Sequence, residues 1–229
     1  MSLFSSKHLY ILISFGICLS TTWAGDGFPI WDNPVRFKQD LRRTTLATNL
    51  PNITETGHTL GVQLKVASIF ANSDETLAVP GGRLTIYPNP GYNIWVQLSS
   101  WPGSTPSFGV GTGIQVEFQG DNPKRRQAVG LTWNEIHADG YAQRDISFHG
   151  LYGFSSKELS AGIIFVVDLH HVIVENGNGI PDYDETIYIA VPYISWLWKE
   201  SFRMSMMLPL NSTGPGLILG GEFMIGKRS

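Results

Sequence analysis

The stretch FGVGTGIQVEFQ, residues 108–119, decides the fold. Its even positions hold Phe, Val, Thr, Ile, Val and Phe, and its odd positions hold three glycines followed by Gln, Glu and Gln. Because successive side chains of a β-strand point to opposite faces, this alternation predicts a strand with one apolar face and one small, polar face. The glycines have strand spacing and no Lys-Ser/Thr ending, so they are not a phosphate loop, and we expect them to let neighbouring backbone pack closely.

The same period of two recurs outward from this stretch along residues 58–226, and it predicts about ten strands. Many of them are about ten residues long, which is the length that a tilted strand needs to cross a bilayer. Strands of soluble proteins are most often five or six residues long. The expected strands are 58–70, 82–88, 91–101, 108–119, 127–136, 144–154, 159–173, 186–197, 201–208 and 216–226.

The links between these strands are expected to alternate in length. We expect tight links at 88–90, 155–158 and 198–200, an intermediate one at 120–126, and longer ones at 71–81, 102–107, 137–143, 174–185 and 209–215. Barrels of the bacterial outer membrane have an even number of strands, short periplasmic turns and longer external loops. The pattern therefore places both ends of the barrel in the periplasm. Aromatic residues gather beside the tight links, as in an interfacial girdle. They are Tyr92, Tyr152, Phe154, Trp196, Trp198 and Phe202.

Two folds are compatible with strands of this kind. In a soluble sandwich the apolar face forms the core, whereas in a membrane barrel it meets lipid and the polar face lines the interior. The polar faces here are rich in Gly, Ser, Gln and Asn, while a water-facing sheet is usually more charged. We therefore predict an all-β fold, a closed antiparallel up-and-down transmembrane β-barrel of about 8–10 strands; the lower number applies if 82–88 and 91–101 form one kinked strand. A soluble secreted β-sandwich that acts as a binding module is the alternative.

The N-terminal residues predict export. Residues 1–24 combine the positive Lys7, a short apolar core from Leu9 to Leu19 and a cleavage site before Gly25, as in a signal peptide; an anchoring helix that is not removed is the alternative. Cleavage would remove Cys18, the single cysteine of the chain. Because Ile17 precedes Cys18, the sequence does not match a lipoprotein signal. Residues 25–57 are expected to form an extended periplasmic segment with a helical turn near 36–41, and residues 227–229 a polar tail.

Composition excludes several classes of protein. The chain has 229 residues, a formal net charge of −3 and 15% charged residues. A nucleic-acid binder needs a basic face, so no nucleic-acid partner is expected. One cysteine allows neither a disulfide framework nor a site of several cysteines. The sequence predicts no cofactor.

Two longer stretches carry a resemblance. DISFHGLYGFSSKELSAGIIFVVD (145–168) and YIAVPYISWLWKESFRMSMMLPL (188–210) resemble the strand–turn–strand units of small Gram-negative outer-membrane β-barrel proteins. The resemblance covers about residues 58–226 and implies outer-membrane lipid and the barrel-assembly machinery as partners. Such barrels commonly end on an aromatic residue, whereas polar residues follow Ile225 here, a departure that favours the sandwich.

One group of polar residues allows a catalytic hypothesis. Asp145, Ser147 and His149 share a face of one expected strand, and Asp168 and His170 share a face of the next. Neighbours on one face of a strand lie about 6–7 Å apart, too far for a hydrogen bond, so a Ser–His–acid triad must form across strands, for example from Ser147 and His170. A polar network that stabilises a narrow barrel is the alternative interpretation.

Two further patterns suggest metal binding. VENGNGIPDYDE (174–185) resembles the acidic calcium loops of thrombospondin type-3-like repeats, although its first position is Val174 where an aspartate is expected. Its oxygen ligands would be Asn176, Asn178, Asp182 and Glu185. A polar external loop with a turn is the alternative. The side chains of His170 and His171 point to opposite faces of a strand, and the sequence identifies no third ligand for a metal ion.

These patterns together predict a Gram-negative outer-membrane protein with a structural, surface-interaction or narrow-channel role. A lipid hydrolase or acyltransferase embedded in the barrel is the enzymatic alternative. The ligand or transported solute and the oligomeric state do not follow from the sequence.

Overall fold

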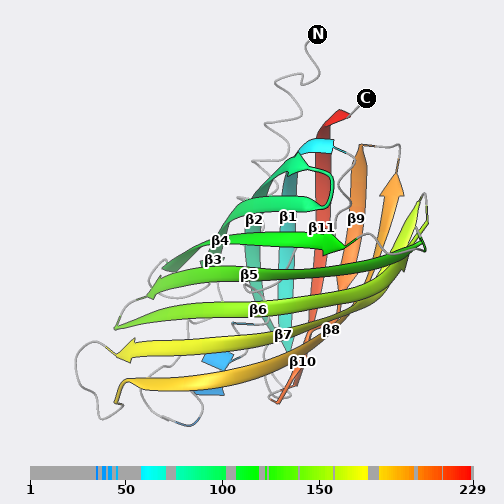
Figure 1. Cartoon of the computed structure of the whole chain (residues 1–229). Coiled ribbons are helices and arrows are strands. Elements are labelled where there is room, and N and C mark those ends of the chain that lie inside the picture. Colours follow the sequence, from blue (N-terminus) through cyan, green and yellow to red (C-terminus); the bar gives the residue numbers. More distant parts are fainter. Residues whose placement is uncertain are drawn as a thin grey trace, which may run out of the picture.

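The fold is a barrel, seen in a computed structural model (Figure 1). The structure describes six residues between Val35 and Thr45, and residues 58–70, 76–101, 107–118, 122, 124–138, 140–156, 158–174, 181–198, 201–212 and 214–227. The expected signal peptide and residues 228–229 of the expected tail lie outside the described residues, whereas Lys227 belongs to the last strand. In the described part of the chain, no helix has the length and apolar character needed to cross a membrane.

The described residues form eleven antiparallel strands. They are β1 (His58–Phe70), β2 (Thr76–Asn89), β3 (Tyr92–Trp101), β4 (Ser107–Phe118), β5 (Arg125–Ala138), β6 (Tyr141–Ser155), β7 (Leu159–Val174), β8 (Tyr183–Trp198), β9 (Phe202–Met207), β10 (Leu210–Asn211) and β11 (Gly214–Lys227).

The sheet is closed. Each strand from β1 to β8 pairs with the next in the chain, and β1 also pairs with β11, from His58 opposite Lys227 to Ile69 opposite Gly216. The short strands β9 and β10 both pair with β8 and with β11, so they are two parts of one strand. Pro209, which has no N–H to donate, lies between them. The barrel therefore has ten strand positions, which confirms the predicted fold class, and the sandwich alternative is wrong.

Two of the expected longer loops contain only two residues. The link at 137–143 contains only residues 139–140 between β5 and β6, and the link at 209–215 contains only residues 212–213 after β10. The physical reason for the first is the Asp139-Gly140 pair, since a two-residue hairpin needs positive φ and Gly140 has φ 85°. β2 also begins at Thr76 rather than at 82. A turn at Gly91, with φ 80°, separates β2 from β3, which excludes one kinked strand.

Alternate side chains point into and out of the barrel. The outward positions hold large apolar residues, among them Leu98, Phe108, Phe165 and Tyr188. The expected girdle residues Tyr152, Phe154, Trp196 and Trp198 are also exposed on this outer face, close to the links β6–β7 and β8–β9. The outer face thus has the apolar character predicted for a membrane barrel, whereas the inward positions, which were expected to be small and polar, also include a group of large apolar residues.

Side chains fill the barrel interior. One part is an apolar core, whose members are Ala67, Val79, Ala128, Ile136, Leu151, Ile164, Val166, Ile187, Ile189, Val191, Tyr193, Met207 and Ile218. Most of the remaining inward positions are polar, and even Gln115, Thr132 and Asn134 have no exposed surface. The interior is thus packed rather than open.

The N-terminal segment, here meaning Val35–Thr45, contacts the barrel at one mouth. Its six described residues have helical backbone, at the place where the sequence predicts a helical turn near 36–41. Leu41 packs against the inward-facing Tyr141 and Val172. In Figure 1 the blue pieces lie at the end of the barrel opposite the cyan start of β1 and the red end of β11. This mouth carries the links β5–β6 and β7–β8, whereas the sequence placed residues 25–57 in the periplasm, beside the barrel termini.

Candidate functional site

A row of polar residues winds around the interior from one end of the barrel to the other. Each member is the cross-strand partner of the next, so the tilt of the strands carries the row from near the barrel termini to the opposite mouth. We call this row the polar stripe. Its members in order are Glu222, Gln63, Arg83, Gln97, Gly111, Asn134, Asp145, His170 and Glu185.

Hydrogen bonds join the middle of the polar stripe. Arg83 Nη2 donates to Gln97 Oε1 over 2.7 Å, and Gln97 Nε2 donates to Asn134 Oδ1 over 3.4 Å. The second bond passes over Gly111, where a β-carbon would lie 2.4 Å from Asn134 Oδ1. The glycines of β4 therefore make room for neighbouring side chains as well as for neighbouring backbone.

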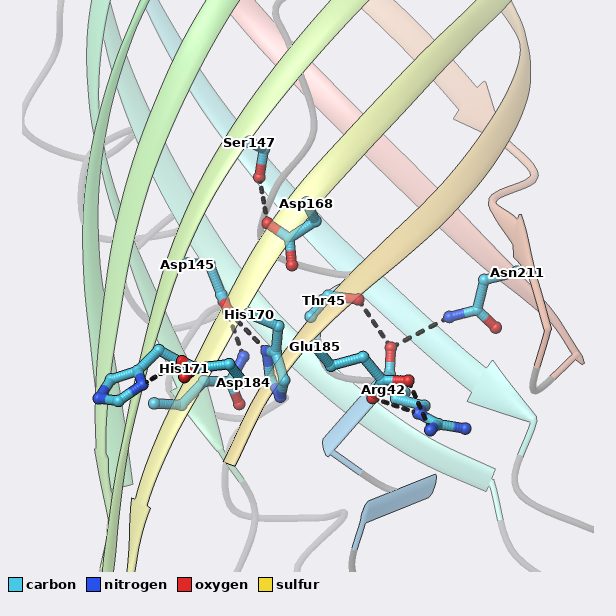
Figure 2. Close-up of polar contacts among 11 residues, drawn as sticks. Arg42, Thr45, Asp145, Ser147, Asp168, His170, His171, Asp184, Glu185 and Asn211 are labelled. Carbon is cyan, nitrogen blue, oxygen red and sulfur yellow. Dashed lines mark hydrogen bonds and ion pairs between the residues drawn. The ribbon is translucent and has the colours of Figure 1, made fainter. Parts of the chain in front are cut away.

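Two carboxylates and a histidine meet where the polar stripe crosses from β6 to β7. Asp145 Oδ1 lies 2.7 Å from His170 Nδ1, and Asp145 Oδ2 accepts a bond of 2.7 Å from Gln143 Nε2. One pair further along the same strands, Ser147 Oγ donates to Asp168 Oδ1 over 2.5 Å. Figure 2 shows Asp145, Ser147, Asp168 and His170, and these four side chains and that of Gln143 are all buried. We call Asp145, Asp168 and His170 the acid–histidine cluster.

The structure pairs the candidate triad residues differently from the expected order. Ser147 is directly opposite Asp168, and Asp145 is directly opposite His170, so the serine contacts a carboxylate and not an imidazole. The third polar residue of this face, His149, points toward β5, because a β-carbon at Gly130 would lie 2.3 Å from its Nε2. Its ring centroid is 6.0 Å from that of Trp95. The sequence correctly grouped these residues on one face but missed the role of Gln143.

The N-terminal segment completes the site at the mouth. Arg42 Nε donates to Glu185 Oε2 over 2.6 Å, and Arg42 Nη2 lies 2.5 Å from Glu185 Oε1, so this ion pair is bidentate. The Arg42 carbonyl oxygen accepts bonds from Thr45 Oγ1 and from Asn211 Nδ2, which is in β10 (Figure 2). Lys38 Nζ lies 4.4 Å from the centre of the Tyr183 ring. The segment is thus bonded to both β8 and β10.

The residues of the expected calcium loop have separate contacts. Asn176 and Asn178 lie outside the described residues. Asp182 Oδ1 accepts a bond of 2.8 Å from the Val174 backbone N–H, and the Glu185 carboxylate is paired with Arg42. The loop therefore stays a prediction, and its last expected ligand already has a cationic partner.

Charged residues also form a rim on the outer face near this mouth. His171 Nδ1 lies 2.6 Å from Asp184 Oδ1, and Arg144 Nε donates to Glu135 Oε1 over 3.1 Å. His171 follows His170 in β7, and Asp184 precedes Glu185 in β8. His171 and Asp184 therefore point out of the barrel, whereas His170 and Glu185 point into it. The sequence anticipated this opposition for the two histidines.

Comparisons with known proteins add little to this description. No protein-family model and no curated protein match the chain. Among solved structures, the chain is similar to the translocator domain of autotransporter NalP from Neisseria meningitidis, with a TM-score of 0.36 and 9% identity over 87% of this chain and 100% of that one. The barrel fold of the chain follows from its own strand pairing.

Proposed function

We propose that the protein is an integral outer-membrane β-barrel with a closed lumen, whose role is structural or surface-interacting rather than the passage of solutes. The observation that carries this proposal is a closed sheet with an apolar outer face around an interior that its own side chains fill.

The outer face supports the membrane part of the proposal. Leu98, Phe108 and Tyr188 have 64%, 63% and 70% of their surface exposed, and many other large apolar residues are exposed on this face. A water-soluble monomer rarely exposes a continuous apolar patch of this extent. Hydrocarbon favours such a surface, and a closed sheet leaves no edge of unpaired backbone groups in lipid. The outward Trp196 and Trp198 suit a membrane–water interface.

The packed interior supports the closed lumen. Ile164, Val191 and Ile218 are among the residues of the apolar core that have at most 1% of their surface exposed. All members of this core come from the strands of the barrel itself. A barrel of about this size is in general just wide enough for side chains to fill.

The enzymatic alternative has less support. A general base must reach the proton that it removes, and a nucleophile must reach its substrate. Ser147 and His170 are buried and bond to separate carboxylates. This arrangement agrees better with a polar network that stabilises the barrel.

The experiment is expression of the full chain in a Gram-negative host, followed by membrane fractionation and by gels of unheated and boiled samples. We expect a band in the outer-membrane fraction whose mobility changes on boiling. A chain without residues 2–24 is the export control and should stay in the cytoplasm. Purified protein in planar bilayers should give no ion conductance steps. A soluble periplasmic product would overturn membrane insertion, and regular conductance steps would overturn the closed lumen.

A further inference from the structure

We propose that Asp145, Asp168 and His170 form a binding site for one divalent transition-metal ion, with Zn²⁺ as the probe. The three residues come from two paired strands and point into the barrel interior. One ligand atom from each lies within 4.8 Å of those of the other two. Ligand atoms around a tetrahedral Zn²⁺ lie about 3.4 Å apart, given Zn–N and Zn–O bonds of about 2.0–2.2 Å. Side-chain shifts of the order of 1 Å would therefore complete the site.

The ligand atoms of the cluster are of types that bind divalent cations. Asp145 and Asp168 are fully buried, and each offers a carboxylate oxygen to the cluster. Gln143 donates a hydrogen bond to Asp145, and Ser147 donates one to Asp168. One imidazole with two carboxylates is a donor set suited to Zn²⁺ or Mn²⁺, whereas Ca²⁺ takes oxygen ligands only.

His170 supplies a second, independent observation. Its side chain is buried, and its Nε2 has no hydrogen-bond partner among the described residues. A buried polar atom without a partner is unfavourable, and a metal ion is a common partner of a neutral imidazole nitrogen. The other ring nitrogen already faces Asp145. Nδ1 of His170 thus lies next to a carboxylate, and Nε2 is available for a ligand.

The surroundings of the cluster resemble the outer shell of a metal site. Gln143 holds Asp145 through a bond of 2.7 Å, and Ser147 holds Asp168 through a bond of 2.5 Å. Such bonds orient carboxylate ligands. The cluster also lies close to the mouth, because His170 is the cross-strand partner of Glu185, which binds Arg42 (Figure 2). An ion would enter from this mouth, past the N-terminal segment.

The test uses the full-length barrel in detergent micelles, freed of metal with EDTA and titrated with Zn²⁺ by calorimetry. We expect one ion per chain, and binding at least 10-fold weaker in the Asp145→Asn and His170→Ala variants. The matched control is the His171→Ala and Asp184→Asn pair of variants, which removes the histidine–carboxylate pair on the outer face of the same region. The change of gel mobility on boiling checks that each variant is folded.

Two measurements on the unchanged chain keep the proposal testable if variants fail to fold. Co²⁺ in place of Zn²⁺ should give visible absorption bands, and diffraction at the zinc edge from crystals soaked in Zn²⁺ should locate the ion between β6 and β7. Absence of saturable binding, an ion located elsewhere, or equal loss of binding in the outer-face control would each overturn the proposal.

Discussion

The indole of Trp95 occupies the space above Gly113, its cross-strand partner in β4. A β-carbon on Gly113 would lie 2.2 Å from Trp95 Cζ2, which is closer than two carbon atoms approach without a bond. Trp95 is fully buried in the interior, and the Arg83 guanidinium carbon lies 5.1 Å from the centre of its ring. The missing side chain at position 113 thus allows Trp95, the largest fully buried side chain among the described residues, to lie across β4.

Replacement of this glycine should destabilise the barrel. Gly113→Ala places a methyl group within the Trp95 ring, and an overpacked interior typically loses about 1–3 kcal/mol of stability. We expect a lower urea midpoint for unfolding from lipid vesicles. Gly150→Ala in β6 is the matched control, since a β-carbon there meets no atom within 4 Å. Equal midpoints for the two variants would show that the ring moves aside freely.

The outer face should require lipid. Phe165 lies in the middle of β7 and is 57% exposed. An arginine near the bilayer midplane of a barrel costs about 2–4 kcal/mol, so Phe165→Arg should reduce the folded fraction in vesicles. His171→Arg, in the charged rim near the end of the same strand, should have little effect. If Phe165→Arg instead folds normally in vesicles and becomes soluble without detergent, the outer face does not meet lipid.

The ion pair at the mouth should hold the N-terminal segment. Glu185→Gln weakens the pair with Arg42 and leaves the segment sequence unchanged. Both side chains are partly exposed, so we expect a loss of about 1 kcal/mol, equivalent to roughly 5-fold faster trypsin cleavage after Lys38. The control Glu135→Gln weakens the outer pair with Arg144 and should not change the rate. Equal cleavage rates in the two variants would show that Glu185 does not keep the N-terminal segment bound to the barrel.

A second ion pair, between Arg126 of β5 and Glu117 of β4, should stabilise the end of the barrel near its termini. Arg126 is buried, bonds to Glu117 and also donates to Ser160 over 3.3 Å. Arg126→Met leaves Glu117 with a partly buried charge, and we expect a loss of about 3 kcal/mol.

The double variant Glu117→Met with Arg126→Met tests this reasoning, because it removes both charges. Urea unfolding should show the double variant to be more stable than Arg126→Met alone. Additive losses in this double-mutant cycle would mean that the two side chains act independently.

The strands of the barrel were predictable because the alternation of apolar and polar residues is visible within each strand. The alternation in 108–119 reports which side chains share a face, and the same holds for Asp145, Ser147 and His149. The shortness of the β5–β6 link could also have been read from Asp139-Gly140, a pair typical of two-residue hairpins. A helical turn near 36–41 was also expected, but the contacts of the N-terminal segment were not, since they are to residues distant in sequence, such as Glu185.

The partners across strands were not predictable in the same way. In the structure β6 and β7 place Ser147 opposite Asp168, whereas a shift of two residues would place Ser147 opposite His170. Both registers keep every side chain on the same face, so the polarity pattern does not distinguish them. The turn between Ser155 and Leu159, together with packing of the interior, selects the observed register.

The sequence by itself therefore determined that the chain forms long strands, which side chains of each strand face outward or into the interior, and the approximate number of strands. Only the tertiary structure decided the register that builds the polar stripe, the meeting of Asp145, Asp168 and His170, and the bond between Arg42 and Glu185. The physical reason is that the direction of a side chain in a strand follows from the local backbone, whereas its neighbour across the sheet depends on how turns and packing align residues that are far apart in the chain.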